Sequence, residues 1–188
     1  MSASANNVRM MARDGEAVLV LGGGCFWCLE AVYEEVKGVR EAVSGYAGGD
    51  IANPKYRQVT SGTSGHAEVV AVYYDPKQLK LSDLMDVFFV IHDPTTPDRQ
   101  GNDVGSQYRS IAFYQNAEEK AEIEAAIERA QSQWGNPIVT QVAPIDAFYT
   151  AEDYHQQYFE LNGEQPYCNI IIAPKIAKFR KEFAELRK

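Results

Sequence analysis

Residues 16–36, EAVLVLGGGCFWCLEAVYEEV, decide the fold at the start of this chain. The apolar run Glu16–Gly22 predicts a short buried strand, and the glycines that follow it predict a turn. From Phe26 to Val36 the apolar residues recur at helical spacing, which predicts a helix that ends at Gly38. A strand that passes through a glycine turn directly into a helix is a β–α unit, and Cys25 lies at its junction.

The rest of the chain continues to mix strands and helices. Further strands are expected at Val39–Tyr46, Ala67–Tyr74, Arg109–Gln115 and Ile138–Pro144, with a last extended apolar run at Cys168–Ala173. Further helices are expected around Leu84–Ile91 with Ser82 as N-cap, after Asn116 with Glu119 completing a capping box, at Tyr154–Leu161 and at Lys175–Lys188. The long segment His92–Tyr108 is expected to be a loop, either functional or disordered. We therefore expect one α/β (α+β) domain in which helices pack on a mixed sheet.

Composition excludes several classes of protein. A chain of 188 residues is enough for about one domain with a single core. Its 45% hydrophobic and 23% charged residues exclude a disordered chain, a fibre and a coiled coil. The net charge of −8 disfavours binding to nucleic acid or to an anionic membrane surface. The longest apolar stretches, Val87–Ile91 and Ile170–Ala173, are too short to span a bilayer.

The cysteine content and the N-terminal residues indicate the cellular compartment in which the protein works. Three cysteines are too few, and odd in number, for a disulfide framework. Residues 1–15 lack the apolar segment of a secretory signal, so we expect them to form a mobile tail that precedes a single domain over residues 16–188. Both observations favour the reducing cytoplasm, where cysteines stay free or become catalytic. We expect the domain to act as a monomer.

Cys25 is the strongest candidate for chemistry. The exposed amides at a helix N-terminus favour an anion, so we expect a lowered pKa and a more nucleophilic thiol. Phe26 and Trp27 supply an apolar wall beside the sulfur. A buried cysteine with two core aromatics would be the ordinary interpretation of an isolated cysteine. The strand, the glycine turn and a second cysteine one helical turn later favour catalysis.

Cys28 completes a C-x-x-C spacing that has three interpretations. It could form a thioredoxin-like dithiol with Cys25. It could be half of a zinc site, but the sequence has no second C-x-x-C or H-x₃-H pair. It could also be an auxiliary or incidental thiol beside a nucleophile.

Glu68 is a candidate general acid. On its strand it shares a face with Val70, Val72 and Tyr74. A carboxyl among apolar side chains tends to keep its proton, which suits proton donation, although a lone strand Glu more often reaches water. Most of the 11 tyrosines must serve packing. Tyr56 and Tyr108 stand in polar segments, each next to an arginine, where a hydroxyl could donate to a substrate oxygen.

These residues resemble a known family, the A-type peptide-methionine (S)-S-oxide reductases. The segment Gly24-Cys25-Phe26-Trp27-Cys28-Leu29-Glu30 is similar to the GCFW signature of that family. Further family-like motifs follow in the expected order at residues 45–49, 65–70, 102–110 and 154–158 (GYAGG, GHAEVV, NDVGSQYRS and YHQQY), and together they cover about Leu19 to Lys178. The resemblance implies a single catalytic domain, a two-layer sandwich with a ferredoxin-like core.

The resemblance also implies a mechanism without a metal or a bound cofactor. Cys25 attacks the sulfoxide sulfur and Glu68 protonates the oxygen, while Tyr56 and Tyr108 hydrogen-bond that oxygen. Phe26 and Trp27 hold the methyl group, and Asp103 supports the site. Methionine leaves and Cys25 becomes a sulfenic acid. A second thiol then forms a disulfide, which thioredoxin or a similar dithiol reductant opens. The activity implied is repair of methionine S-sulfoxide, free or in oxidised proteins.

The second thiol has two candidates. Many relatives carry it in a glycine-rich C-terminal tail, which this chain lacks. Cys168 falls broadly where such cysteines occur and follows a segment, Asn162–Pro166, that could allow movement. Cys28 is close to Cys25 on any helical model. We favour Cys168, although a buried strand cysteine is nearly as good an interpretation of it.

Two other classes of function remain as rivals. A thioredoxin-type oxidoreductase would use Cys25 and Cys28, but no proline stands between them and Glu68 would have no role. A non-catalytic module that binds oxidised proteins would tolerate Cys25→Ser. Reduction of insulin disulfides would favour the first rival, and binding without turnover would favour the second.

Overall fold

The computed structural model describes residues 11–188, so the first ten residues of the expected mobile tail lie outside the described residues. The main sheet has the strand order β7-β6-β1-β3-β2-β8. Its strands are β1 (Ala17–Gly22), β2 (Val39–Ala47), β3 (Ala67–Tyr74), β6 (Ile111–Tyr114), β7 (Gln141–Pro144) and β8 (Phe148–Thr150). All neighbours are antiparallel except β6 and β7, which are parallel, so the expected mixed sheet is confirmed.

The centre of the sheet has ferredoxin-like connectivity, as expected. Helix α2 (Phe26–Tyr33) connects β1 to β2, and helix α4 (Leu81–Ile91) lies between β3 and β6 in the sequence. These elements form a β-α-β-β-α-β unit with the strand order β6-β1-β3-β2. Helix α5 (Ala117–Gln131) then connects β6 to the parallel edge strand β7.

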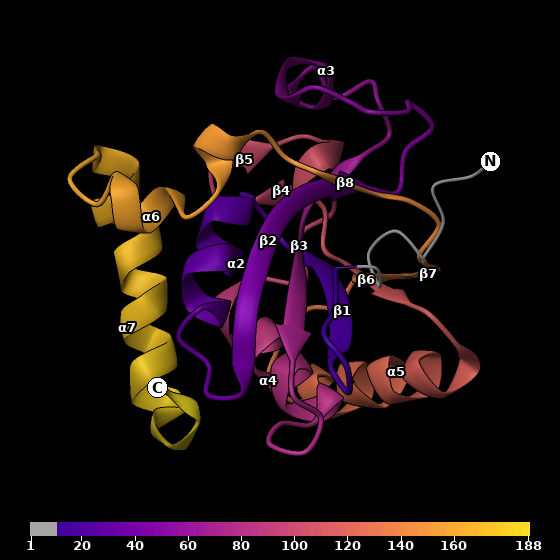
Figure 1. Ribbon diagram of the computed structural model, residues 1–188, viewed down its shortest axis with the longest axis vertical. Helices are drawn as coiled ribbons and strands as arrows, with labels where there is room; N and C mark the ends of the chain where they lie inside the picture. The colour runs from indigo at the N-terminus through magenta and orange to yellow at the C-terminus, as the bar shows by residue number, and fades with distance from the viewer. Residues whose placement is uncertain (1–10) are drawn as a thin grey trace.

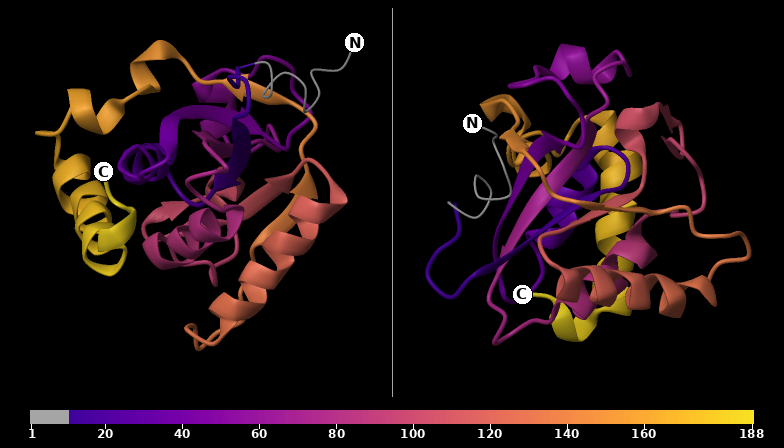
Figure 2. Two further views of the ribbon diagram at one scale, coloured as in Figure 1. Left: turned by 60° about the horizontal axis from the view of Figure 1, so that its bottom comes forward. Right: turned by 90° about the vertical axis from the view of Figure 1, so that its right-hand side faces the viewer.

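The long helices gather on one face of the sheet. Figures 1 and 2 show α2, α4 and α5 packed beside the strands, with α7 (Ala173–Glu182) outside α2. One apolar core unites these helices with alternate residues of β1 and β3, such as Leu19, Leu21, Val70 and Val72. The sandwich therefore has two layers, and the chain passes from the C-terminal end of the central strand β1 directly into α2.

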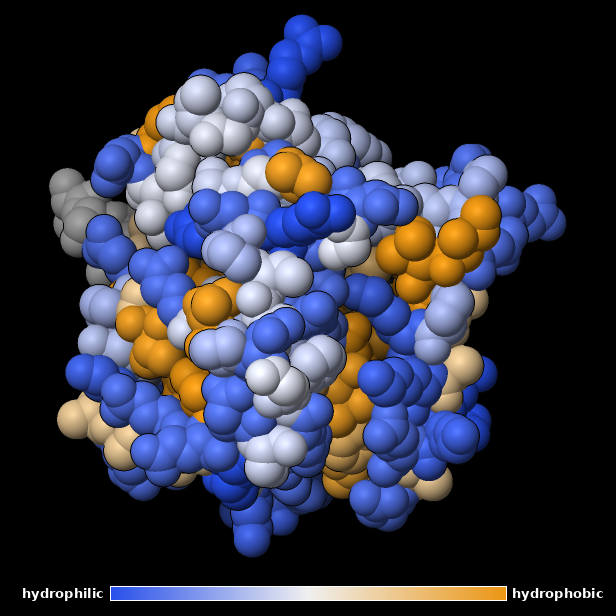
Figure 3. Space-filling model, turned by 180° about the vertical axis from the view of Figure 1, so that it is seen from behind, coloured by the Kyte–Doolittle hydropathy of each residue, from blue (hydrophilic) through white to orange (hydrophobic). Residues whose placement is uncertain are grey.

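The other face of the sheet is also buried. A second apolar cluster there contains Val20, Val69 and Phe113 from the sheet, covered by Ile145 and Phe148. Burial on both faces explains why β1 and β3 are continuous apolar runs rather than alternating ones. Seen from behind, the surface carries small apolar patches between hydrophilic side chains (Figure 3).

The C-terminal part differs from the expectation. The expected extended run Cys168–Ala173 is wrong, since Cys168–Ile172 forms a π-helix, η3, that runs directly into α7. Cys168 and Ile172 are both buried and stand four residues apart, a helical spacing that a six-residue apolar run does not distinguish from a strand. The basic helix ends at Glu182 and is followed by a 3₁₀ turn, η4 (Ala184–Leu186).

Several short elements differ from the expectation: some were not expected, and two short helices were expected as a single helix. The long segment contains a hairpin of β4 (Arg99–Gln100) and β5 (Asp103–Val104) and a 3₁₀ turn η1 (Ser106–Tyr108). The helix expected at Tyr154–Leu161 is two short helices, η2 (Asp153–His155) and α6 (Tyr158–Leu161). Helix α3 (Tyr56–Thr60) and strand β8 were missed, because elements of three to five residues carry little periodicity.

The two helix starts predicted from capping residues have opposite outcomes. The Asn116 side chain accepts a hydrogen bond from the Glu119 amide at 2.9 Å, which confirms that cap. The Glu119 carboxylate binds the Gln115 amide at 2.8 Å, one residue before the cap. Ser82 as N-cap is wrong: the N-cap of α4 is Lys80, two residues earlier, and Asp83 accepts from the Lys80 amide at 3.0 Å. None of the helices within residues 11–188 is long and apolar enough to cross a membrane.

Because Asn116 caps its helix and Ser82 does not, truncating the two side chains to alanine should change the free energy of unfolding by different amounts. Asn116→Ala should lower the free energy of unfolding by about 1 kcal/mol, because it removes the acceptor of a helix-terminal amide. Ser82→Ala is the matched control and should change it by less than about 0.5 kcal/mol. Urea unfolding followed by circular dichroism measures both. Equal effects of the two substitutions would contradict the assigned start of α4.

Candidate functional site

The predicted β–α junction places Cys25 at the N-cap of α2. The preceding turn needs glycine, because Gly24 has φ +91° and a side chain at Gly23 would approach His92 to 2.8 Å. The Gly24 amide donates to the Tyr108 carbonyl at 3.1 Å, which fixes the turn against η1. His92 lies buried beneath the turn, and burial lowers its pKa to about 3, so it is a neutral packing residue.

Glu68 projects from β3 against the first turn of α2. One carboxyl oxygen, Oε1, accepts from the Phe26 amide at 3.2 Å. The other, Oε2, is buried and has no hydrogen-bond partner among the described residues. The side chain is only 1% exposed, and this burial raises the pKa of Glu68 to about 8, although the Phe26 amide opposes the rise. Glu68 therefore keeps its proton at neutral pH, as expected of a general acid.

The expected low pKa of Cys25 is wrong. Burial raises the pKa of the Cys25 thiol, and the carboxyl of Glu68 and the thiol of Cys28 raise it further. The Trp27 amide at the start of the helix does lower it, which is the effect expected from the sequence. That effect is outweighed, because desolvation disfavours the thiolate, and an ionised Glu68 would add a like charge beside it.

The structure brings Tyr56, Tyr108 and Asp103 to the same place from α3, η1 and β5. Burial raises the pKa of both tyrosines, and nearby Glu68, Asp103 and Cys25 raise it further. Glu152 orients the first tyrosine, since its carboxylate accepts from the Tyr56 amide and from the Tyr46 hydroxyl, each at 2.9 Å. Both phenols are therefore neutral hydrogen-bond donors close to Glu68 and Cys25.

An aromatic cluster surrounds the indole of Trp27. Its ring stacks on Tyr158 with centroids 3.7 Å apart and planes 6° apart, and it meets the edge of Tyr167 at 5.8 Å. Its Nε1–H donates to His155 Nδ1 at 3.1 Å. Trp27 stays partly exposed, whereas Phe26 is fully buried beneath it, 5.1 Å from the His155 ring.

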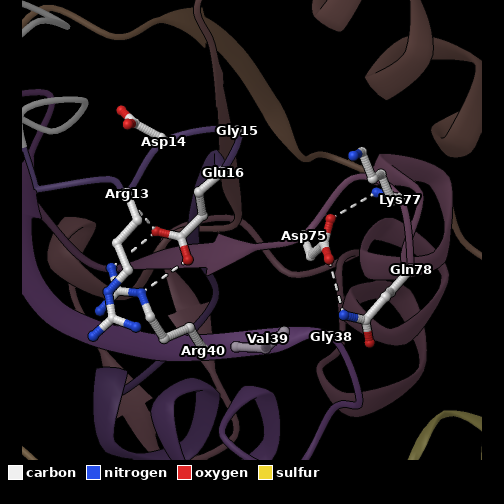
Figure 4. A pocket seen from close by; sticks show the side chains of 10 residues that line it. All are labelled: Arg13, Asp14, Gly15, Glu16, Gly38, Val39, Arg40, Asp75, Lys77 and Gln78. Carbon is white, nitrogen blue, oxygen red and sulfur yellow. Dashed lines mark hydrogen bonds and ion pairs between the residues drawn. The ribbon is translucent and has the colours of Figure 1, made fainter.

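A pocket of about 270 Å³ opens at Cys25. It is lined by Asp103 and Gln100 of the hairpin and by Tyr167, Ile170 and Lys175 of the C-terminal segment. A larger pocket of about 530 Å³ lies at the opposite end of the strands, where β1 begins (Figure 4). Arg40 is paired there with Glu16 through Nε and Nη2, and no cysteine lines the pocket.

The three cysteines are free and buried. Cys28 lies one turn after Cys25, and its Sγ is 3.8 Å from the hydroxyl of Tyr167, which donates to Asp103 at 2.7 Å. Cys168 lies in η3; burial raises the pKa of its thiol, with no contribution from Cys25. Within residues 11–188, no group of three or more His, Cys, Asp or Glu side chains could hold a metal ion.

Sequence reasoning missed five side chains that build this site: Glu30, Glu152, His155, Tyr158 and Tyr167. Three of them, Glu30, His155 and Tyr158, stand in family-like motifs that were noticed but gave them no role. The other two carried no signal, because a glutamate or tyrosine without its neighbours in space is indistinguishable from a surface or packing residue.

Comparisons with known proteins point to one family. A sequence model of the family described as peptide methionine sulfoxide reductase matches residues 17–187. The peptide methionine sulfoxide reductase MsrA of Arthrobacter sp. (strain FB24) is 54% identical over 165 residues, which are 88% of this chain and 95% of that protein. The crystal structure of reduced Mxr1 from Saccharomyces cerevisiae has a TM-score of 0.78 at 36% identity and covers 84% of this chain and 92% of its own. Mxr1 in complex with Trx2 has a TM-score of 0.56 at 31% identity, covering 78% and 88%.

The raised pKa of Glu68 predicts a specific dependence of stability on pH. Between about pH 4.5 and 8 the unfolded chain releases this proton while the folded chain keeps it, so stability falls as the pH rises. Relative to Glu68→Gln, the wild type should lose on the order of 5 kcal/mol across that range, at about 1.4 kcal/mol per pKa unit. Urea unfolding from pH 4 to 9 measures the difference, with the exposed Glu122→Gln as control. A constant difference between wild type and Glu68→Gln would contradict the raised pKa.

Proposed function

Because the chain belongs to the peptide methionine sulfoxide reductase family, we propose that Cys25 and Glu68 together reduce the S epimer of methionine sulfoxide. The observation that carries this proposal is the buried, protonated carboxyl of Glu68. It lies next to the Cys25 thiol, and its Oε2 has no hydrogen-bond partner among the described residues. A proton donor without a partner at the start of α2 suits a substrate with a basic oxygen next to an electrophilic sulfur.

The first step forms a sulfur–sulfur bond and passes protons from the Cys25 thiol to Glu68 and from Glu68 to the substrate oxygen. The Cys25 sulfur attacks the sulfoxide sulfur while Glu68 gives its proton to the sulfoxide oxygen, and the thiol proton replaces it on Glu68. The oxygen then transfers as hydroxyl from the substrate sulfur to Cys25, so methionine leaves and a sulfenic acid remains. The raised pKa values of Cys25 and Glu68 fit these reaction steps, because the thiol passes its proton to the carboxyl during the reaction and no free thiolate is needed at the start.

The surrounding side chains have matching roles in the proposal. Tyr56 and Tyr108 donate to the sulfoxide oxygen and stabilise the charge that develops on it. The partly exposed Trp27 holds the methyl group, and Phe26 supports it from below. Asp103 acts through the hydroxyl of Tyr167, which it fixes at 2.7 Å.

For the second step we propose Cys28 as the thiol that resolves the sulfenic acid. It is on the first turn of the helix that Cys25 starts, and its thiol influences the pKa of Cys25. Attack of the Cys28 thiol on the sulfenic sulfur forms the disulfide and releases water. Cys168, which the sequence favoured, is held inside the π-helix, so its attack would require η3 to rearrange.

The last step returns the disulfide to two thiols. A dithiol protein supplies two electrons by thiol–disulfide exchange and becomes oxidised itself. The complex of the similar Mxr1 with Trx2 supports a thioredoxin as that reductant here. Since the three cysteines are free, we propose that the chain works in a reducing compartment such as the cytoplasm, as a monomer.

The reaction is tested with separated S and R epimers of a methionine sulfoxide peptide and dithiothreitol. Wild type should consume the S epimer alone, and Cys25→Ser should consume neither. Glu68→Gln should lower kcat about 10²–10⁴-fold, the usual contribution of a general acid. A folded wild type that turns over neither epimer but reduces insulin disulfides would overturn the proposal in favour of a dithiol oxidoreductase.

The second thiol is tested by treating Cys28→Ser and Cys168→Ser with one equivalent of substrate without reductant. Cys28→Ser should accumulate the sulfenic acid, trapped by dimedone at Cys25, whereas Cys168→Ser should form the Cys25–Cys28 disulfide. Peptide mass spectrometry distinguishes the products. A Cys25–Cys168 disulfide in wild type would restore the assignment that the sequence favoured.

A further inference from the structure

The carboxyl of Glu30 is a buried titratable group that the proposed mechanism leaves unused. The residue lies on α2 and is 2% exposed. Its Oε2 accepts from the Ser44 hydroxyl of β2 at 3.0 Å, and its Oε1 accepts from the Tyr158 amide of α6 at 3.2 Å. One carboxyl therefore joins three elements at the side of α2.

The segment that Glu30 holds is an unusual turn. Gln157 has φ +54° and ψ +36°, the left-handed conformation that residues with a Cβ rarely adopt. The Gln156 side chain accepts from the Ser44 amide at 3.0 Å and donates to the Ser44 carbonyl at 2.9 Å. Ser44 is thus a common anchor: Gln156 binds its backbone and Glu30 binds its side chain. The turn ends with the Tyr158 amide pointed at Glu30.

This turn carries two of the ring partners of the Trp27 indole, whereas Tyr167 meets it only edge-on. Tyr158 stacks on the ring at 3.7 Å between centroids, and His155 accepts from Nε1 at 3.1 Å. The indole sits on the first turn of α2 and makes no other hydrogen bond within residues 11–188. Its orientation therefore depends on where the 155–158 segment sits, and that position depends on Glu30 and Gln156.

We propose that Glu30 is a positioning residue that orients Trp27 through Tyr158 and so sets the affinity of the site for the sulfoxide methyl group. The inference rests on the proposed function for the role of Trp27. The carboxyl joins these elements because two donors approach it from different elements, and its two oxygens accept one each. Methionine has a similar shape and no acceptor oxygen, so Glu30→Met loses both bonds, whereas glutamine could keep both by donating its amide to the Ser44 hydroxyl.

The first test reads Trp27 directly, without turnover. In ¹⁵N-labelled protein, Glu30→Met should shift the Trp27 indole N–H resonance toward the position of a free indole, while the Trp134 resonance stays in place. The KM for a methionine S-sulfoxide peptide should rise roughly tenfold with little change in kcat, as when an apolar contact with substrate is lost.

Glu34→Met is the matched control. Glu34 lies one turn further on, at the C-cap of α2, and also accepts from a backbone amide, that of Ala42 at 3.1 Å, but this bond goes to β2 alone. The control should leave the Trp27 resonance and KM at their wild-type values. Equal effects of both substitutions, or an unchanged Trp27 resonance in Glu30→Met, would overturn the proposal.

Tyr158→Leu keeps the amide that binds Glu30 and removes the stacked ring, so it tests the second link even if Glu30→Met does not fold. It should raise KM by a similar factor, and the double variant should be no worse than either single one, because both break one pathway. An unchanged KM in Tyr158→Leu, or additive effects in the double variant, would refute the proposal. An inactive wild type with the expected resonance shift in Glu30→Met would instead contradict only the proposed reaction.

Discussion

Burial of the Glu68 carboxyl under the first turn of α2 is the constraint on which the rest of the site depends. The Phe26 amide binds one oxygen and leaves the other free, and desolvation keeps the proton on the group. The same burial, which is the larger cause of its raised pKa, keeps the proton on the Cys25 thiol. The pair can therefore transfer a proton internally, and a substrate that accepts it completes the arrangement.

The fold serves this pair by covering the sheet on both faces. The helices and the 145–148 segment remove water from β1 and β3, so the Glu68 carboxyl near the start of β3 is shielded from the solvent that would stabilise its charge. Segments far apart in the sequence then cover the ends of the strands at which Cys25 and Glu68 lie. Glu152 places Tyr56, the Gly24 amide holds η1, and the Tyr167 hydroxyl is fixed on Asp103.

The polar side chains around α2 divide into two sets. Glu68 faces the thiol and keeps a free oxygen, which is the property of a reacting group. Glu30 has both oxygens occupied by donors from β2 and α6, which is the property of a structural tether. Two buried glutamates with raised pKa thus have different uses, and the distinction lies in whether a bonding position stays open.

Local patterns in the sequence were enough to predict the β1–α2 junction with Cys25 at the start of the helix, β3 with Glu68 on its apolar face, and the Asn116 cap, because spacing and capping act over a few neighbouring residues. They were not enough for η3, α3 or the start of α4, where tertiary packing outweighs weak local signals. The raised pKa of Cys25 and the partners of Trp27 were decided only by the tertiary structure. The Glu68 carboxyl comes from β3 and the ring of Tyr158 from α6, and no local pattern records which distant residues will surround and desolvate a side chain.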